Sequence, residues 1–311
     1  MKKLSIIIPV YYNELNIPVT YERLNELTDK INAELEFVFI DDGSGDNSFE
    51  LLTQYSSKDH RIKVIKLSRN FGSHVAILAG LTHATGDCAS IISADLQDPP
   101  ELIIDMFRDW DEGNEIVLAV RRDREESFFQ VWFSNAYYSL MRKYALANMP
   151  EGGFDFVLLD RKVINVIISI KEKNTTIMGL ILWVGFKHSI HYYTRQRREI
   201  GKSRWTLSKK IKLFIDSFLA FSYMPVRYMS AVGIILFFLA VGYSSVLVFQ
   251  KLWLGQTVEG WTSLMVVVLM LSSIQLLSLG IIGEYLWRTF DETRNRPIFI
   301  IDKVVQKEEI Q

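Results

Sequence analysis

The stretch "CASIISADLQDPPEL" (residues 88–102) decides the fold of this 311-residue chain. Its first half is apolar and has the length of one buried strand, and its second half supplies carboxylates, an amide and two prolines. An unpaired buried charge is too costly to keep, so acid groups directly behind a buried strand must meet solvent, a helix end or a cation. The stretch therefore predicts a strand whose carboxyl end opens on a polar cleft.

Apolar runs of the same length recur through the first two thirds of the chain. They read "LSIIIPV" (4–10), "LEFVFIDD" (35–42), "IKVIKL" (62–67) and "EIVLAV" (115–120). Helical patterns, such as residues 73–84 and 100–112, separate them. Short apolar strands that alternate with helices predict an α/β fold with a parallel sheet covered on both faces. Ligands of such sheets bind beyond the carboxyl ends of the strands, where Asp41, Asp42 and Asp95 fall.

The charge balance argues against a nucleic-acid partner, because 35 basic and 36 acidic residues leave a net charge of −1. The basic residues nevertheless cluster in two groups, and such clusters attract phosphates or anionic lipid headgroups. The first group is Arg121, Arg122 and Arg124, and the second is Arg195, Arg197, Arg198, Lys202, Arg204, Lys209, Lys210 and Lys212.

A single cysteine, Cys88, excludes an internal disulfide and a cysteine-based zinc site.

After Tyr223 the composition changes. Residues 228–250 and 261–283 contain no charged residue, and each stretch has 23 residues where a membrane-spanning helix needs about 20. A hydrophobic hairpin inside a large soluble core is the alternative. Basic residues flank the pair on its outer sides, which by the positive-inside rule predicts a cytoplasmic location for both ends. They are Arg227, Arg288, Arg294 and Arg296.

Two further stretches have the composition of helices that lie in the membrane interface. Residues 127–146 are rich in aromatics, and residues 205–225 combine apolar residues with lysines. Amphipathic helices of this kind can lie among lipid headgroups. A core-facing helix is the alternative for the first stretch, whereas the second leads into a span and favours the membrane surface.

The turn "DDGSGDNS" (41–48) approaches a dinucleotide-binding fingerprint but lacks its third glycine. Carboxylates before such a turn would repel a pyrophosphate, so the pattern argues against a hydride-transfer enzyme. Asp41 and Asp42 suit another role better, as acceptors for a base imide or a ribose hydroxyl.

Seven motifs in order carry a resemblance to a known family. They are "SIIIPVYYNELNI" (5–17), "VFIDDGSGDNS" (38–48), "LSRNFGSHVAILAGL" (67–81), "ADLQDPPEL" (94–102), "AVRRDR" (119–124), "FDFVLLDRKV" (154–163) and "GKSRW" (201–205). Together they resemble the GT-A-fold glycosyltransferases that load a sugar onto a polyprenyl phosphate. This group includes dolichol-phosphate mannose synthases and bactoprenol (undecaprenyl-phosphate) glucosyltransferases. Two C-terminal spans are typical of the bactoprenol branch.

The resemblance implies which residues bind the donor. The nucleotide end of the sugar donor would be held by Pro9, Tyr11, Glu14, Asp41, Asp42 and Asp95. The "ADLQD" turn is similar to the family's metal site, so Asp95 and Gln97 would ligate Mg²⁺ or Mn²⁺ on the donor diphosphate. Oxygen ligands suit these hard cations. Ser93 stands where the family's first aspartate is common, which puts a metal role of residue 93 in doubt. For Asp98, a helix N-cap is the alternative to a metal role.

An acceptor phosphate must approach the donor diphosphate against electrostatic repulsion. Two unit charges 4 Å apart repel by roughly 4 kcal/mol at an effective dielectric constant of 20, so cations must offset this energy. The resemblance makes Arg121, Arg122, Arg124, Arg198, Ser203 and Arg204 the residues that grip the acceptor phosphate. It also places Asp155 near the sugar, where it could orient the acceptor or act as a base. Asp160 is expected to cap the helix that follows it.

These implications combine into one expected activity. A UDP-sugar, with glucose as the first choice, donates its hexose to undecaprenyl phosphate with inversion at the anomeric carbon. The alternatives are transfer of another sugar (mannose, galactose or an N-acetylhexosamine), a processive polysaccharide synthase, and a non-catalytic nucleotide-sugar-binding membrane protein. The resemblance further implies a homotetramer in the plasma (inner) membrane.

The expected domain plan follows the same order along the chain. It comprises a cytoplasmic GT-A (Rossmann-like) domain at 1–204, a juxtamembrane helix at 205–225, two spans with a short external loop at 226–288 and a cytoplasmic tail at 289–311.

Overall fold

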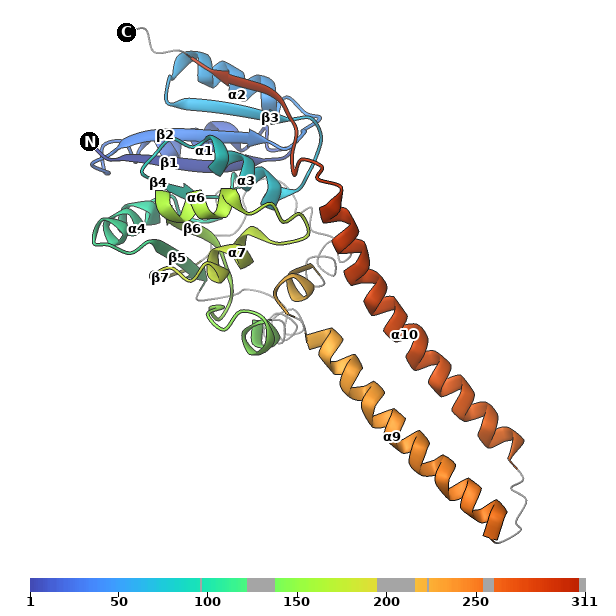
Figure 1. Cartoon of the computed structure of the whole chain (residues 1–311). Coiled ribbons are helices and arrows are strands. Elements are labelled where there is room, and N and C mark those ends of the chain that lie inside the picture. Colours follow the sequence, from blue (N-terminus) through green and yellow to red (C-terminus); the bar gives the residue numbers. More distant parts are fainter. Residues whose placement is uncertain (96, 122–137, 195–215, 223, 254–259, 308–311) are drawn as a thin grey trace. The chain divides into compact units, whose positions relative to one another are not determined.

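The fold was analysed in a computed structural model, which describes residues 1–95, 97–121, 138–194, 216–222, 224–253 and 260–307. Figure 1 labels its elements in chain order: β1 (Lys3–Val10), α1 (Ile17–Asn25), β2 (Glu34–Asp41), α2 (Ser48–Lys58), β3 (Ile62–Leu67), α3 (Ser73–His83), β4 (Cys88–Ile91), α4 (Leu102–Asp111), β5 (Ile116–Arg121), β6 (Phe154–Asp160), α6 (Arg161–Ser169), α7 (Ile177–Trp183), β7 (His188–Tyr193), α9 (Met224–Trp253), α10 (Trp261–Thr293) and β8 (Ile301–Gln306). Residues 138–144 and 216–221 are also helical.

The strands form one eight-stranded mixed sheet in the order β7-β5-β6-β4-β1-β2-β3-β8. At its centre β4, β1, β2 and β3 are parallel neighbours, and β7 pairs in parallel with β5. The two antiparallel strands are β6, which lies between β4 and β5, and β8, which pairs with β3. The mostly parallel sheet flanked by helices that the apolar runs predict is therefore confirmed.

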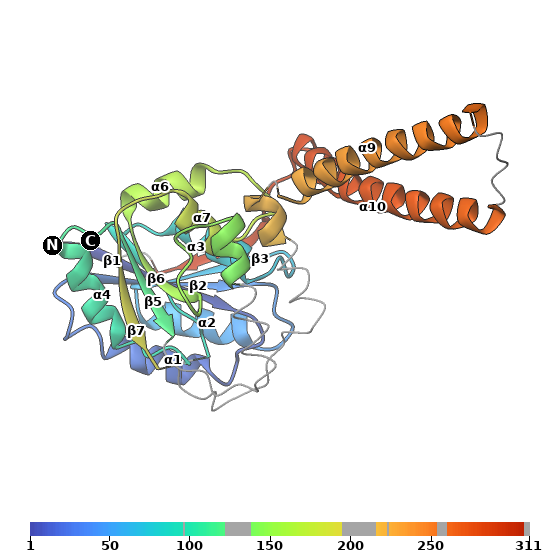
Figure 2. The same ribbon diagram turned by 90° about the horizontal axis from the view of Figure 1, so that it is seen from below.

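Helices cover both faces of this sheet (Figures 1 and 2). On one face α1, α2 and α4 pack over a hydrophobic core, to which β1 and β2 contribute the buried side chains Leu4, Ile6, Ile8, Phe37 and Phe39. The other face is covered by α3, α6 and α7. Because residues on both faces are buried, the strands read as continuous apolar runs rather than as alternating patterns.

Helix α3 lies close against β1 and β2 through Gly80. A Cβ atom at this position would lie 2.5 Å from Ile7 Cγ2 and 2.6 Å from Ile40 Cδ1. Such distances are far below van der Waals contact, so only glycine allows this approach of helix to sheet. The close packing holds the second half of α3 against β1 and β2.

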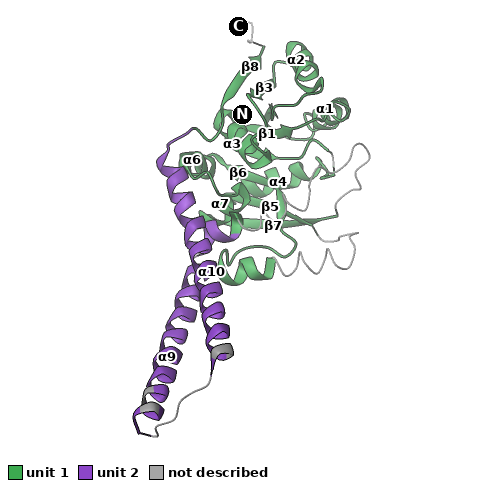
Figure 3. Cartoon of the chain, turned by 90° about the vertical axis from the view of Figure 1, so that its right-hand side faces the viewer, with its two compact units in different colours: residues 1–217, 297–311 green, residues 218–296 purple. Residues whose placement is uncertain are grey.

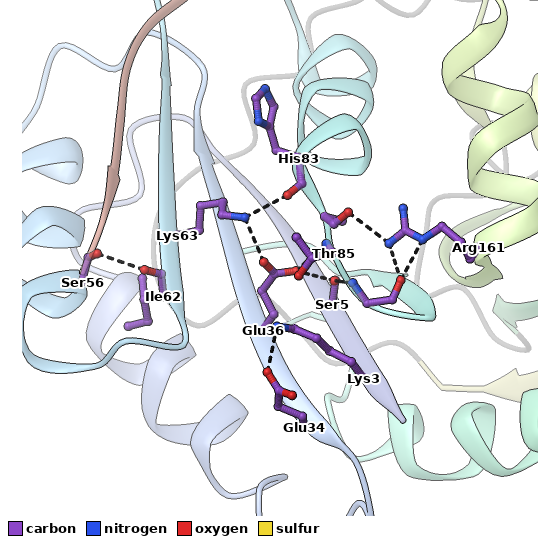
Figure 4. A network of polar contacts seen from close by, with 12 residues as sticks. Lys3, Ser5, Glu34, Glu36, Ser56, Ile62, Lys63, His83, Thr85 and Arg161 are labelled. Atoms are coloured by element: carbon purple, nitrogen blue, oxygen red, sulfur yellow. Dashed lines mark hydrogen bonds and ion pairs between the residues drawn. The ribbon is translucent and has the colours of Figure 1, made fainter. Parts of the chain in front are cut away.

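A buried polar network ties the amino ends of the parallel strands together (Figure 4). The carboxylate of Glu36 on β2 accepts hydrogen bonds from Ser5 Oγ at 2.5 Å, from the Thr85 N–H at 2.8 Å and from Lys63 Nζ at 3.0 Å. Burial alone would raise the pKa of Glu36, but these donors and the lysine charge hold it below its ordinary value. The network lies at the end of the sheet opposite the aspartates that follow β2 and β4.

The chain divides into two compact units, shown in Figure 3. Unit 1 comprises Met1–Ser217 and Pro297–Gln311, and unit 2 comprises Phe218–Arg296. Unit 1 therefore contains chain from both sides of unit 2. Residues 301–306, which the sequence analysis leaves in a C-terminal tail, form β8 and extend the sheet beside β3.

Unit 2 consists largely of α9 and α10. Within them Met224–Leu247 and Ser263–Thr293, of 24 and 31 residues, are long and apolar enough to cross a membrane. None of either apolar window is buried in the structure, which does not fit a hairpin inside a soluble core. The two C-terminal helices expected from the uncharged stretches are thus present.

The expected interfacial helices fall partly outside the described residues. Of the stretch 127–146 the structure describes residues 138–146, which are helical to residue 144 and bury Met141 and Leu146. Of the stretch 205–225 it describes residues 216–222, 224 and 225. Their expected place in the membrane interface stays a prediction.

Candidate active site

The carboxyl ends of β1, β2 and β4 lie next to one another because these strands are parallel neighbours. Val10 at the end of β1 pairs with Asp41 at the end of β2, and Ile7 pairs with Ile91 at the end of β4. The loops that leave these strands carry the residues expected to bind the donor. The sheet therefore brings the expected donor residues from three separate motifs to one edge.

Hydrogen bonds join the loop after β1 to the loop after β2. The Tyr12 N–H donates to Ser44 Oγ at 3.0 Å, and the Glu14 carboxylate accepts from the side-chain amide of Asn47 at 3.0 Å. Glu14 therefore holds the two loops together, whatever else it binds. Pro9 lies within β1, directly before this pair of loops.

Tyr12 is a residue of this site that the sequence analysis does not single out. Its φ of 55° lies in the left-handed region, which is uncommon for a residue other than glycine. Its ring meets that of Tyr11 edge to face, with centroids 4.7 Å apart. A Cβ atom on Gly45 would lie 2.7 Å from the Tyr12 hydroxyl oxygen, so the glycine leaves room for this ring. Only the tertiary contacts reveal Tyr12, because a tyrosine pair in a loop carries no local signal.

Asp41 and Asp42 are both buried, and their carboxylates have different partners. The Asp42 carboxylate accepts from the N–H groups of Phe71 and Gly72 at 2.7 and 2.9 Å, and it thereby holds the loop before α3. Burial raises the pKa of Asp42 to about 6, although the two N–H donors act to lower it. Asp41 accepts from the Ser44 N–H at 3.2 Å through Oδ1, while its Oδ2 has no hydrogen-bond partner among the residues that the structure describes. Burial raises the pKa of Asp41 as well.

The turn after Asp42 requires glycine. Gly43 has a φ of 67°, and a Cβ atom there would lie 2.5 Å from the backbone carbonyl carbon of Arg69. Both the left-handed backbone and the close approach exclude a side chain. Gly43 thus lets the end of β2 approach the loop that carries Asn70, Phe71 and Gly72.

The loop after β4 holds the expected metal ligands. Asp95 and Gln97 are both partly exposed. The Ser93 hydroxyl donates to Asp95 Oδ1 at 2.6 Å, and the Gln97 N–H donates to the same oxygen at 3.3 Å. Ser93, which replaces the expected aspartate, is therefore placed to orient Asp95.

The donor atoms of this loop fit a hard divalent cation. Asp95 offers a carboxylate and Gln97 an amide oxygen, and cations such as Mg²⁺ are bound by one or two carboxylates together with substrate phosphates. Among the described residues no group of three His, Cys, Asp or Glu side chains could hold a metal ion. A cation at Asp95 and Gln97 would thus depend on the donor's phosphates for the rest of its ligands.

Arg121 and Asp155 lie on neighbouring strands and form an ion pair. The pairing of β5 with β6 shifts register between Ala119, opposite Phe156, and Val120, opposite Phe154, so Asp155 is the extra residue of a bulge. Bulges re-aim side chains and are common near active sites. The Asp155 side chain is 60% exposed and that of Arg121 only 15%. The Asp155 charge raises the pKa of Arg121, although burial of the guanidinium acts to lower it.

Two buried residues extend this pair toward the loop after β4. The Tyr193 hydroxyl donates to Asp98 Oδ1 at 2.5 Å, and Tyr193 is the direct register partner of Arg121 in the pairing of β5 with β7. Sequence reasoning missed Tyr193, because a tyrosine at the end of a strand carries no motif. Burial together with the Asp98 charge raises the pKa of Tyr193, so its hydroxyl keeps its proton.

Several expected acceptor residues lie outside the described residues. They are Arg122, Arg124, Arg198, Ser203 and Arg204. Their expected contact with the acceptor phosphate stays a prediction. Asp160 does cap a helix as expected, because its carboxylate accepts from the Lys162 N–H at the start of α6.

Comparisons with known proteins give the following similarities. Residues 5–168 match the model of glycosyl transferase family 2. The chain is 42% identical over 300 residues to YkcC, an uncharacterized glycosyltransferase of Bacillus subtilis (strain 168), with 96% of this chain and 93% of that protein covered. It is 34% identical over 303 residues to a prophage bactoprenol glucosyl transferase homolog of Escherichia coli (strain K12), with 97% and 99% covered. The solved mannosyl-3-phosphoglycerate synthase of Rubrobacter xylanophilus aligns with a TM-score of 0.48 and 17% identity over 69% of this chain and 71% of that one.

Proposed function

The chain belongs to glycosyl transferase family 2, and from this premise we propose that it transfers a hexose from a UDP-sugar to undecaprenyl or another polyprenyl phosphate. The observation that carries the proposal is the extent of the likeness to a protein named as a bactoprenol glucosyl transferase homolog. It covers 97% of this chain and therefore includes the two apolar helices as well as the sheet. Glucose is the first choice for the sugar on the same ground.

The reaction we propose is a single displacement with inversion. An oxygen of the lipid phosphate forms a bond to the anomeric carbon, and the bond from that carbon to the diphosphate oxygen breaks, which releases UDP. The acceptor phosphate is already ionised at neutral pH, so it needs little help from a general base. Positioning of the two phosphates and neutralisation of their charges are then the main tasks of the protein.

The described residues divide these tasks between the two sides of the cleft. Asp41, whose buried Oδ2 has no hydrogen-bond partner within the described part of the chain, is the candidate acceptor for a nucleoside N–H or O–H group. Asp95 and Gln97 would hold Mg²⁺ or Mn²⁺, which supplies Lewis-acid stabilisation of the leaving diphosphate. On the acceptor side, Arg121 supplies a positive charge. Asp155 orients the Arg121 guanidinium through their ion pair.

The membrane helices would hold the active site where the acceptor headgroup emerges. We place α9 and α10 across the plasma (inner) membrane with unit 1 and both chain ends in the cytoplasm. The arginines that flank the two spans, Arg227 before the first and Arg288, Arg294 and Arg296 at and beyond the end of the second, support this orientation. A lipid acceptor needs such an anchor, because its phosphate stays at the membrane surface.

A transfer assay tests the proposal. Purified protein in detergent receives undecaprenyl phosphate and a panel of radiolabelled nucleotide sugars, with Mn²⁺ or with EDTA, and label is counted in the organic phase. We expect label from one UDP-sugar, dependence on the metal ion, and loss to background in Asp95→Asn. Asp111→Asn, which changes an exposed aspartate of α4, serves as the matched control and should keep full activity.

Three results would contradict the proposal in different ways. Full activity of Asp95→Asn would show that the Asp95 carboxylate is not needed for transfer. A labelled polymer, instead of one sugar per lipid, would identify a processive synthase. Binding of a nucleotide sugar without transfer to any acceptor would identify a non-catalytic binding protein.

A further inference from the structure

Four polar groups follow one another across the candidate active site, and of these Asp155 is exposed while the other three are buried or partly buried. Asp98 follows β4, Tyr193 ends β7, Arg121 ends β5 and Asp155 lies near the start of β6. The Tyr193 hydroxyl donates to Asp98, Tyr193 pairs in register with Arg121, and Arg121 forms the ion pair with Asp155. The four groups thus lead from the loop of the expected metal ligands to the expected acceptor side.

Sheet register accounts for the central contact. Arg121 and Tyr193 are directly paired residues of the parallel strands β5 and β7. Paired residues of neighbouring strands point to the same face of the sheet, with their side chains about 5 Å apart. The ring of Tyr193 packs edge to face on Phe156 of β6, with centroids 6.2 Å apart, which fixes where the hydroxyl points.

The hydroxyl of Tyr193 is suited to join an arginine to a carboxylate. It donates a hydrogen bond to Asp98 and keeps oxygen lone pairs beside the neighbouring guanidinium, and no apolar side chain can do either. Tyr193 is 7% exposed and Asp98 only 1%, so water cannot easily replace the hydroxyl. Asp98 directly follows Gln97, so the position of Asp98 constrains the metal loop.

We propose that Tyr193 is a positioning residue for the transfer reaction, which sets the separation between the metal loop at Asp95–Asp98 and the acceptor-side pair of Arg121 and Asp155. The proposal rests on the proposed function and goes beyond it, because it assigns a role to a residue that contacts neither substrate. Misplacement of reacting groups by about 1 Å can lower a rate by about 10²-fold. Loss of the hydroxyl should therefore act on catalysis more than on donor binding.

The test compares Tyr193→Phe with Tyr21→Phe in the full-length protein. Tyr21 offers a matched control, because its hydroxyl donates to Asp59 at 2.9 Å, and Asp59 in turn binds Arg61. Both variants lose one tyrosine–aspartate bond beside an arginine, but the Tyr21 group lies outside the candidate active site. We expect Tyr193→Phe to lower kcat about 10- to 100-fold with little change in KM for the nucleotide sugar, and Tyr21→Phe to leave both constants unchanged.

A second measurement does not depend on activity. Hydrogen–deuterium exchange of the peptide that covers residues 93–101 should rise in Tyr193→Phe and stay unchanged in Tyr21→Phe. If the wild type transfers no sugar, the proposed function fails, and the exchange result alone decides whether Tyr193 holds the loop. If the wild type is active and the two variants match it in kcat, the positioning role is overturned. Equal exchange in the two variants would overturn it as well.

Discussion

At the scale of the residue, Ser93 stands where the resembled motif has an aspartate and is hydrogen-bonded to Asp95, the proposed metal ligand. Its hydroxyl donates to Asp95 Oδ1 at 2.6 Å and so restricts the orientation of that carboxylate. A serine brings no charge, so the loop offers a cation one carboxylate where the family's common motif has two. In the proposed site the remaining ligands would come from Gln97 and from the donor phosphates. Metal affinity in the absence of a nucleotide should accordingly be low.

Asp42 gives a prediction about pH at the same scale. Its pKa is about 6 in the folded chain against an ordinary value of 3.8, so the folded state binds more protons than the unfolded state between these values. The free energy of unfolding that Asp42 contributes must therefore fall as the pH rises through this window, by at most about 1.4 kcal/mol per pH unit. In Asp42→Asn this decrease in the free energy of unfolding should be absent.

Apparent melting temperatures of the two purified proteins between pH 4 and pH 7 check this prediction. The melting temperature of Asp42→Asn minus that of the wild type should increase as the pH rises from about 4 to about 6. Above about pH 6 this difference should stay constant. A difference that does not vary with pH would show that Asp42 titrates alike in the folded and unfolded chain.

At the scale of the element, sequence reasoning succeeds where the signal is local. Strands β1 to β5 are predicted because their residues are buried on both faces and so form unbroken apolar runs. Strand β7 reads "HSIHYY" and β8 reads "IDKVVQ", and both are edge strands with mostly exposed or partly exposed side chains. Their partners lie far away in the sequence, as in the pairing of Lys63 with Gln306. Such pairing depends on the tertiary fold and leaves no local pattern.

The residues of the candidate site also divide into those that a local sequence pattern predicts and those that depend on long-range strand pairing. Asp41, Asp42 and Asp95 follow predicted strands, so their place at the carboxyl edge of the sheet follows from the sequence. Tyr193 reaches the site only through the register of β5 with β7, which no local pattern encodes. The bulge that re-aims Asp155 is equally invisible before the strands are paired.

The network at the amino ends of β1, β2 and β3 makes a prediction at this scale. Lys63→Met leaves the Glu36 charge buried without its cation, and breaking a buried ion pair in this way costs about 3–5 kcal/mol. The double variant Lys63→Met with Glu36→Leu should recover part of this loss, because an apolar pair replaces the ion pair while the Ser5 hydroxyl and the Thr85 N–H lose their acceptor. Urea unfolding of the purified full-length protein measures both.

Lys3→Met serves as the matched control for this network. Lys3 pairs with Glu34, whose side chain is 59% exposed, so its loss should cost at most about 1 kcal/mol. If the double variant were as unstable as Lys63→Met alone, the cost would come from lost packing rather than from the unpaired charge.

At the scale of the whole molecule, the sheet of unit 1 is completed by a strand that follows the apolar helices α9 and α10. Val305 of β8 packs against the core of unit 1, whereas its neighbour Val304 is 50% exposed. Val305→Asp should therefore destabilise unit 1 by about 1–3 kcal/mol, because a carboxylate would replace an apolar contact. Val304→Asp should change stability by less than about 0.5 kcal/mol.

The difference between these two variants in apparent melting temperature tests whether β8 stabilises the sheet. Equal melting temperatures for both variants and the wild type would show that unit 1 is stable without this strand.

The return of the chain to the sheet has a consequence for biosynthesis. A ribosome releases β3 more than 200 residues before β8, and both apolar helices are made in between. Until then β3 presents an open strand edge, which is a template for aggregation. The last strand can close that edge only after both apolar helices have been synthesised. A nascent chain that is cut short before residue 301 keeps its edge exposed, and cellular quality control can recognise it by that edge.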